Sequence, residues 1–413
     1  MTQTPTTPPP ESGVPGAGVP PPFPFPIRSA LDPSPEYALL RADRPVSRVT
    51  LPSGDTAWIV TRFEDVRTVF HDARFSRQAA TREGAPRLMP GVEADPDSIV
   101  SKDPPDHTRL RKLVAPAFTA RRIAGMREGI QRTTDELLDA MEAGGREGDL
   151  VSGLSAPLPI ITICDLLGVP RSDQDRFREW SDTMFRTSAD ALGEAIAARE
   201  ALIGYLAAMV QGRRAAPTDD LLGVLIAARD EDDRLTEREL VSFAGGLIVA
   251  GYETTANRLA NSVLVLLRHP EQLRLLRGEP ERIGDAVEEL LRYIPGGAAG
   301  GLMRVATEDV ELGGELIRAG EGVIAVTNAA NRDPAQWDDP DRFDITRKPQ
   351  SHTTFGHGIH HCVGAQLARL ELQVGIATLL RRFPGLALGA PEDRLPWKKN
   401  VVIHSLEALP VTW

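Results

Sequence analysis

A glycine-rich stretch near the end of the chain carries the residues best suited to chemistry. It reads FGHGIHHCVG, from Phe355 to Gly364, and places one cysteine, Cys362, beside several histidines. The glycines remove side chains that would keep a large flat ligand away from the backbone. The run that follows, AQLARLELQVGIATLLRRF, has apolar residues at helical spacing and predicts a helix. A cysteine at the start of a helix meets a positive dipole end and free N–H groups, and both favour a thiolate.

Four interpretations of Cys362 are open on this stretch alone: a zinc ligand, a nucleophile, a thiolate ligand of haem iron, or a packed core thiol. Zinc is disfavoured because adjacent His and Cys residues cannot close around one tetrahedral ion. The spacing of Phe355, Gly358 and Gly364 around the cysteine resembles the haem-binding signature of the cytochrome P450 family. The resemblance implies that Cys362 holds the iron of haem b and that Phe355 and Gly364 lie against the cofactor.

Length, charge and cysteine content narrow the class of protein. A chain of 413 residues exceeds the usual size of one core, so two domains or one large helical fold are expected. The formal net charge of -11 argues against nucleic acid and anionic membranes as partners. Two cysteines far apart argue against disulfides. We find no signal peptide and no apolar run of about 18 residues, and expect a cytoplasmic protein without a membrane span.

The chain divides into a short lead-in and one long domain. Residues 1–24 are rich in Pro, Thr and Gly and are predicted to be disordered, whereas residues 25–413 are expected to form a single domain. Two strand-like segments flank the turn signal PSGD and predict a β-hairpin over 45–61, followed by a short helix, FEDVRTVFHD. The Gly- and Pro-rich stretch 75–106 predicts a long loop of the kind that often binds ligands.

The longest helical pattern, residues 236–269, has an unusual middle, AGYETTAN. Gly251 costs about 1 kcal/mol in a helix, and Thr254 can return its hydroxyl to the carbonyl of Ala250 and bend the helix. Taken alone, Glu253 and Thr254 could be surface residues. With the haem candidate, the motif resembles the oxygen-activation motif of cytochrome P450. That resemblance implies that Ala250 and Gly251 let the backbone lie over the iron, that Thr254 hydrogen-bonds dioxygen and that Glu253 relays protons.

Tyr252 stands beside the acid in the same motif. Its side chain has two interpretations, as part of the pocket roof or as packing within the helix layer.

Several basic residues match positions that bind the haem propionates in this family. His107 and Arg111 follow the loop sequence DPP, are four residues apart and share one helix face. The alternative for this pair alone is a solvated basic face. By the resemblance, His107, Arg111, Arg304 and His360 are propionate ligands.

A Glu–x–x–Arg pair, Glu289 and Arg292, lies in the helical pattern EELLRYIP. In isolation such a pair is a common surface ion pair worth less than about 1 kcal/mol. The segment PDRF follows it along the chain, so Arg342 could complete a buried Glu–Arg–Arg set. The set resembles the structural triad of the family, which fixes the core beneath the haem.

Together the motifs predict the cytochrome P450 fold: mainly α with a small β-rich part, and haem between the long central helix and the Cys-ligand loop. The missing membrane anchor resembles the bacterial soluble class, which takes electrons from NAD(P)H through ferredoxin reductase and ferredoxin. We expect an acidic ferredoxin to dock near Arg109, Lys112 and Arg121 on a monomeric protein. The glycines of PGGAAGGLM suggest a roomy pocket wall and hence a bulky small-molecule substrate, of the kind found in secondary metabolism.

Three alternative functions remain at this point. Oxidative C–C or C–N coupling or desaturation cannot be separated from hydroxylation by sequence. A peroxide-driven peroxygenase is disfavoured by the acid and alcohol at Glu253 and Thr254. A catalytically idle haem protein is disfavoured because Cys362, the Glu–x–x–Arg pair and the acid–alcohol pair are all intact.

Overall fold

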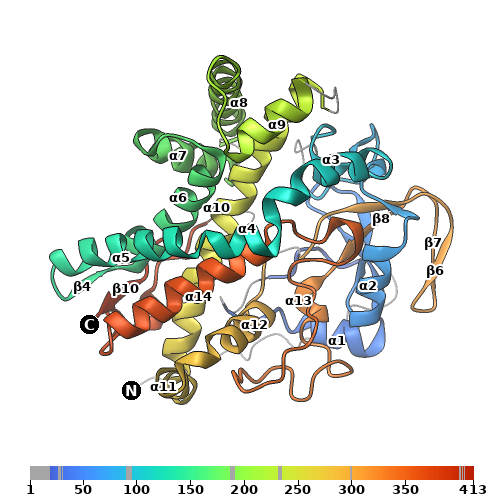
Figure 1. The fold of residues 1–413 in the computed structure, drawn as a ribbon. Helices are drawn as coiled ribbons and strands as arrows, with labels where there is room; N and C mark the ends of the chain where they lie inside the picture. Colours follow the sequence, from blue (N-terminus) through green and yellow to red (C-terminus); the bar gives the residue numbers. More distant parts are fainter. Residues whose placement is uncertain are drawn as a thin grey trace, which may run out of the picture.

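The molecule has a helical part and, beside it, a part built around a mixed β-sheet (Figure 1). The computed structural model describes residues 19–26, 29, 31–89, 95–186, 191–230, 235–297, 300–399, 401, 403 and 405–413. Within this part of the chain the α-helices are α1 (Glu36–Asp43), α2 (Phe63–His71), α3 (Asp106–Val114), α4 (Ala120–Gly125), α5 (Arg127–Ala143), α6 (Pro157–Leu167), α7 (Gln174–Met184), α8 (Leu192–Ala215), α9 (Leu221–Asp230), α10 (Glu237–Arg268), α11 (Pro270–Gly278), α12 (Ile283–Tyr293), α13 (Thr327–Ala330) and α14 (Ala365–Arg382).

The strands form one larger sheet and two small ones. In the larger sheet the order is β1 (Val46–Thr50), β2 (Thr56–Val60), β8 (Gly322–Ala325), β5 (Arg304–Ala306), β3 (Phe75–Ser76). A second sheet has the order β4 (Glu147–Asp149), β10 (Pro410–Thr412), β9 (Ala387–Leu388), and β6 (Val310–Leu312) pairs with β7 (Glu315–Ile317). The prediction of a mainly α protein with a small β-rich part is confirmed.

The N-terminal half of the larger sheet was predictable from alternation. β1 and β2 pair antiparallel with Val46 opposite Val60, which confirms the hairpin around PSGD. The helix predicted after it is α2. β2 then pairs in parallel with β8, Trp58 opposite Val323, a contact between residues too far apart in sequence for local patterns to indicate. The segment predicted as a long loop contains β3 and two short 3-10 turns, Ala79–Thr81 and Ile99–Ser101.

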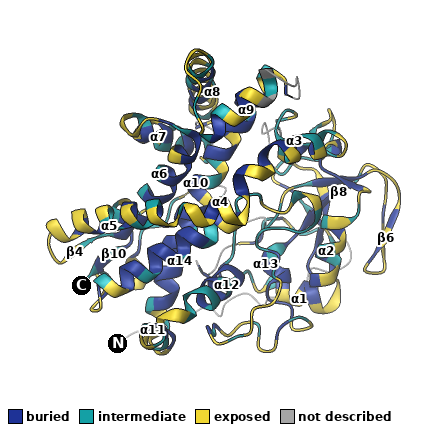
Figure 2. Ribbon diagram, viewed as in Figure 1, coloured by how far each residue is buried: buried dark blue, intermediate teal, exposed yellow. Residues whose placement is uncertain are grey.

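α10 runs through the helical part and is its central element (Figure 1). Its start is fixed by the predicted capping box: the hydroxyl of Thr236 accepts the N–H of Glu239 at 3.1 Å, and the carboxylate of Glu239 accepts the N–H of Thr236 at 2.9 Å. The helix has 32 residues, about 48 Å at 1.5 Å per residue. α10 and α14 are buried along much of their length (Figure 2), so both belong to the main hydrophobic core.

The prediction of disorder through residue 24 is wrong at its end. Phe23 is 2% exposed and packs against Phe25, and its N–H donates to the carbonyl of Thr50 at 2.8 Å. The buried aromatic ring and the hydrogen bond to β1 order this segment, although its composition predicted disorder. Residues 1–18 lie outside the described residues. Among those described, no helix combines the length and the apolar character needed to cross a membrane.

Candidate functional site

The loop that carries Cys362 is held tightly at both ends. The N–H of Cys362 donates to the carbonyl of Phe355 at 2.9 Å, and α14 begins directly after Gly364. Gly358 has φ +69°, and a Cβ there would lie 2.6 Å from the carbonyl oxygen of Phe70 in α2. Only glycine fits this close approach without strain, so the glycine at this position fixes the loop against α2.

The thiol of Cys362 remains accessible although much protein surrounds it. Burial raises its pKa. Hydrogen bonds from the N–H groups of Gly364 and Ala365 and the charge of Arg111 act in the opposite direction. The sulfur therefore receives the helix N-terminal donors that the sequence predicted. Among the residues with described positions, no group of three or more His, Cys, Asp or Glu side chains is arranged to hold a metal ion.

The middle of α10 presents one accessible face in a helix that is otherwise largely buried. Gly246, Ala250 and Thr254 are exposed and are spaced by four residues, so they share that face. The hydroxyl of Thr254 donates to the carbonyl oxygen of Ala250 at 2.7 Å, which confirms the predicted bond. The accessible face of α10 therefore offers a small side chain and a hydroxyl.

Glu253 points away from that face into protein. It is 2% exposed, and its Oε1 accepts the amide N–H of Asn257 at 3.1 Å and lies 3.4 Å from the ammonium of Lys398. Burial raises the pKa of Glu253, while Lys398 and Asn257 act to lower it. Tyr252 is also 2% exposed and donates its hydroxyl to Asp182 at 3.2 Å, so its side chain belongs to helix packing and not to a pocket roof.

The missing side chain at Gly251, which the resemblance implied would let the backbone lie over the iron, also has a packing reason. A Cβ at this position would lie 3.3 Å from the side chain of Ile163 in α6. The missing side chain therefore lets α10 approach α6. Packing also explains a glycine of PGGAAGGLM: a Cβ at Gly301 would lie 2.3 Å from the carbonyl oxygen of Ala325 in β8. Close packing against β8 accounts for this glycine, so it is no sign of a roomy wall.

The predicted propionate ligands converge in one basic cluster. The ring centroids of His107 and His360 are 4.3 Å apart, and His360 lies near Arg304 and Arg77. Arg111 donates to the carbonyl of His361 at 2.7 Å and so borders the same loop. Sequence reasoning missed Arg77, which is 6% exposed and donates from Nε to the carbonyl of Val100 at 2.8 Å.

This cluster fits an anionic group. Burial, with the nearby positive groups, lowers the pKa of His360 to about 3 and that of Arg304 to about 9. The Nε2 atom of His360 is buried and lacks a hydrogen-bond partner among the described residues. Asp103 is the carboxylate beside Arg77 and Arg304. Buried cations with so little compensation are favoured by a bound anion, and haem carries two carboxylates on one edge.

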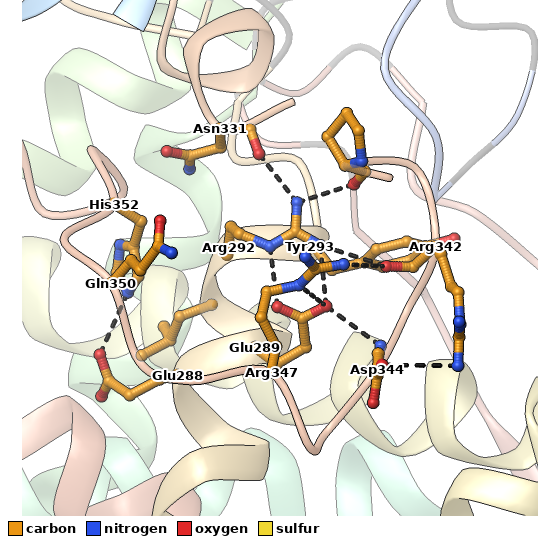
Figure 3. Close-up of polar contacts among 12 residues, drawn as sticks. Glu288, Glu289, Arg292, Tyr293, Asn331, Arg342, Asp344, Arg347, Gln350 and His352 are labelled. Atoms are coloured by element: carbon orange, nitrogen blue, oxygen red, sulfur yellow. Dashed lines mark hydrogen bonds and ion pairs between the residues drawn. The ribbon is translucent and has the colours of Figure 1, made fainter. Parts of the chain in front are cut away.

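The Glu–x–x–Arg pair is buried and fully bonded (Figure 3). Nε and Nη2 of Arg292 donate to the two carboxylate oxygens of Glu289 at 2.7 and 2.8 Å. Nη1 donates to the carbonyls of Asn331 and Pro340 at 2.9 and 2.8 Å. α12 is thereby joined to the chain that leads to the Cys362 loop.

The third member of this set is Arg347, and the prediction of Arg342 is wrong. Arg347 Nε lies 3.3 Å from Glu289, whereas the Arg342 side chain is 63% exposed and lies 3.5 Å from Asp344 (Figure 3). The carbonyl of Arg342 accepts from Arg292 Nη2 at 3.3 Å. Because the backbone at residue 342 turns its carbonyl inward, the side chain points outward.

A second ion pair, between Glu288 and Arg369, lies beside the Glu289–Arg292 pair and fixes the Cys362 loop more directly. Arg369 in α14 donates to both oxygens of Glu288 at 2.5 and 2.9 Å, and its guanidinium lies 4.6 Å from the ring centroid of Phe355. His352 Nε2 lies 3.2 Å from the same carboxylate. Although burial acts upward, the bonds to His352 and Arg369 lower the pKa of Glu288 to about 2. The ring of Phe355 is held in place by the guanidinium of Arg369, which stacks on it.

Comparison with known proteins agrees with this geometry. The model of the family Cytochrome P450 matches residues 45–409. This chain is a cytochrome P450. It is 51% identical to the nocardicin C N-oxygenase of Nocardia uniformis subsp. tsuyamanensis over 95% of this chain and 98% of that protein. It is 46% identical to the mycinamicin IV hydroxylase/epoxidase of Micromonospora griseorubida over the same shares of the two chains.

Solved structures show the same fold. The crystal structure of HinD with NMFT and NO superposes with a TM-score of 0.91 at 49% identity, covering 96% of this chain and 100% of that one. The predicted cytochrome P450 fold and the predicted monooxygenase class are confirmed, and the family implies haem as cofactor.

The residues that sequence reasoning missed share one property. Arg77, Arg347 and Lys398 each reach their partners across more than fifty residues or through a backbone carbonyl of a distant segment. Arg347 follows the segment PDRF by four residues, so the sequence offered it as a second candidate for the third member of the Glu–Arg–Arg set. No short-range pattern marks Lys398.

Proposed function

We propose that this P450 inserts oxygen into a sizeable small molecule of secondary metabolism, with electrons from NAD(P)H delivered through ferredoxin reductase and ferredoxin. The observation that carries the proposal is the accessible face of Ala250 and Thr254 beside the buried carboxylate of Glu253. The names of the relatives support the substrate class, since they act on nocardicin C and mycinamicin IV. Leu302 and Val100, which are 57% and 45% exposed, offer apolar contacts for such a molecule.

Haem, bound through Cys362, supplies dioxygen activation and oxygen transfer. We assign its propionates to the basic cluster of Arg304, His107 and His360, with Arg77 and Arg111 at its border. Cys362 offers the thiolate, and the N–H groups of Gly364 and Ala365 stabilise its negative charge. The Glu289–Arg292 and Glu288–Arg369 pairs keep the loop from moving.

Thr254 and Glu253 are the groups that we assign to proton handling. The hydroxyl proton of Thr254 is engaged by the carbonyl of Ala250, so its oxygen is free to accept a hydrogen bond from a donor on the accessible face. Glu253 is a buried carboxyl whose pKa is raised by burial, which suits a group that takes up and releases protons. Its position beside Lys398 and Asp182 gives it a route toward solvent on the α7 side.

The ferredoxin would bind on the basic face of the Cys362 side. Arg121 and Lys112 are exposed there, and Ile359 of the Cys loop is 47% exposed. Arg109 is a weaker candidate than the sequence suggested, because its guanidinium lies 2.6 Å from Glu239. We expect a cytoplasmic monomer. Reduction of the enzyme by an acidic ferredoxin should slow with rising salt, and slow further in Lys112→Glu.

Replacement of Thr254 by alanine tests the proposal. We expect Thr254→Ala to keep the thiolate spectrum and substrate binding, while product per NAD(P)H falls about tenfold or more and hydrogen peroxide rises. Thr255→Ala, at the neighbouring buried position off the accessible face, is the matched control and should keep the parent yield. Unchanged yield in Thr254→Ala would overturn the assignment. If the product carries no oxygen atom from isotopically labelled dioxygen, the reaction is coupling or desaturation instead.

A further inference from the structure

Lys398 connects three segments that are far apart in sequence. It lies in the C-terminal segment between β9 and β10, where its N–H donates to the carbonyl of Ser405 at 2.9 Å. Its Nζ lies 3.4 Å from Glu253 Oε1 in α10 and 3.4 Å from Asp182 Oδ1 in α7. One ammonium therefore bridges two carboxylates on two helices, from a backbone that is itself fixed.

The charges around Glu253 make this ammonium important. On α10 the neutral amide of Asn257 donates to Glu253, on α7 Asp182 adds a like charge, and the C-terminal segment supplies Lys398. Arg178 of α7 acts on the neighbouring Tyr252. Among the described groups that act on Glu253, the cation is Lys398. Without it, a carboxylate that is 2% exposed would face desolvation and a like charge together.

The helix geometry explains why Glu253 depends on such a partner. Neighbouring residues on an α-helix point about 100° apart. Thr254 therefore faces the accessible side while Glu253 faces α7 and the C-terminal segment, which matches the exposure of the one and the burial of the other. The contacts of Glu253 with Asn257 and Lys398 reach the same oxygen, Oε1, and both are longer than 3 Å. Such contacts orient a carboxylate without locking it.

We propose that Lys398 is the positioning residue for Glu253: its ammonium sets the direction and the charge state of that carboxylate and ties both to α7 and the C-terminal segment. This inference rests on the proposed role of Glu253 in proton handling. Because α7 and the C-terminal segment hold the ammonium, a shift of either one changes the proton affinity of Glu253. Proton handling is then coupled to the two segments that the lysine connects.

The test measures the proton affinity of Glu253 without turnover. In the haem-loaded protein, the C=O stretch of the protonated carboxyl is followed by infrared difference spectroscopy over pH and assigned by its loss in Glu253→Gln. Lys398→Met keeps the length of the stem and removes the charge. We expect the midpoint of Glu253 to rise in this variant, by about tenfold in proton affinity. Lys398→Arg should stay near the parent, and Lys399→Met, at the exposed neighbouring lysine, should not change the midpoint.

A double-mutant cycle connects the midpoint to function. Lys398→Met should raise peroxide release and lower product yield, but in the Glu253→Gln background it should add nothing. An unmoved infrared midpoint in Lys398→Met, or additive losses in the double variant, would overturn the inference. If Glu253→Gln alone leaves the yield unchanged while the midpoint still shifts, the proposed role of Glu253 fails and the contact with Lys398 stands. The two failures are thus distinguishable.

Discussion

The Cys362 side and the α10 side of the site are stabilised by different kinds of contact. On the Cys362 side, Arg292 and Arg369 each bind both oxygens of a carboxylate at 2.5 to 2.9 Å, and Glu289 is 4% exposed. On the α10 side, Glu253 is equally buried but is held through one oxygen at 3.1 and 3.4 Å. Bidentate pairs fix geometry, whereas single longer contacts permit rearrangement.

This difference matches the roles that we propose for the two sides, iron ligation by Cys362 and proton handling by Glu253. A metal ligand needs one geometry, so the loop of Cys362 is surrounded by bidentate ion pairs and a glycine that permits close contact with α2. A proton-handling group must change its charge and partners, so weaker contacts suit Glu253. The comparison predicts that variants on the Cys362 side lose stability and cofactor, while variants on the α10 side lose coupling and keep both.

Removal of Glu289 should have the largest effect. Glu289→Ala leaves the buried Arg292 and the half-buried Arg347 without their carboxylate, and we expect the free energy of unfolding to fall by about 3 to 5 kcal/mol. Urea unfolding of the haem protein, followed by the Soret band and by circular dichroism, measures this loss. Arg342→Ala is the matched control: because that side chain is 63% exposed, we expect a change below about 0.5 kcal/mol. Similar losses in both variants would contradict the corrected triad.

Glu288→Gln should cost less and should depend on pH. The pKa of Glu288 is lowered from 4.5 to about 2, so its ionised form stabilises the fold fully above pH 4.5, and this contribution is lost as the pH falls toward 2. We expect Glu288→Gln to lose about 2 kcal/mol at pH 7, with a difference that shrinks between about pH 4.5 and pH 2. Unfolding free energies of both proteins across this range test it. A difference that is constant with pH would show that the pair is not charged.

Gly251→Ala should have the smallest effect. Alanine gains about 1 kcal/mol in helix propensity, and its Cβ must displace Ile163 by a few tenths of an ångström, so we expect a net change within about 1 kcal/mol and an unaltered haem spectrum. Ala250→Leu, one position earlier on the accessible face, should instead obstruct that face and slow CO binding to the reduced protein. If Gly251→Ala blocks CO while Ala250→Leu does not, our assignment of the two positions is reversed.

The sequence predicted those features that local patterns determine. The capping box at Thr236 located the start of α10 to within one residue, and the alternation around PSGD located the first hairpin. The Cys362 loop was identifiable because close approach and helix start require particular residues at particular positions. The direction in which individual side chains point could not be predicted from the sequence. The outward turn of Arg342 and the packing of Gly251 on α6 depend on contacts between distant segments, which periodicity does not report.

Contacts between residues far apart in the sequence could not be predicted either. Lys398 follows Glu253 by 145 residues, and nothing in its neighbourhood marks it as the partner of a buried acid. Phe23 lies in a composition typical of disorder but is covered by the aromatic cluster with Phe25 and Tyr37. In both cases contacts with distant segments outweigh the local signal.

The central claim is that Cys362 offers a thiolate to haem iron from a loop that its ion pairs and glycines hold in one geometry. The most direct test is the difference spectrum of the reduced, CO-treated protein against the reduced protein, recorded for the parent and for Cys362→His. We predict the red-shifted Soret band of a thiolate-ligated CO complex in the parent and its complete loss in Cys362→His. A parent spectrum with the band of a histidine-ligated haem, or a thiolate band that survives in the variant, would contradict the account.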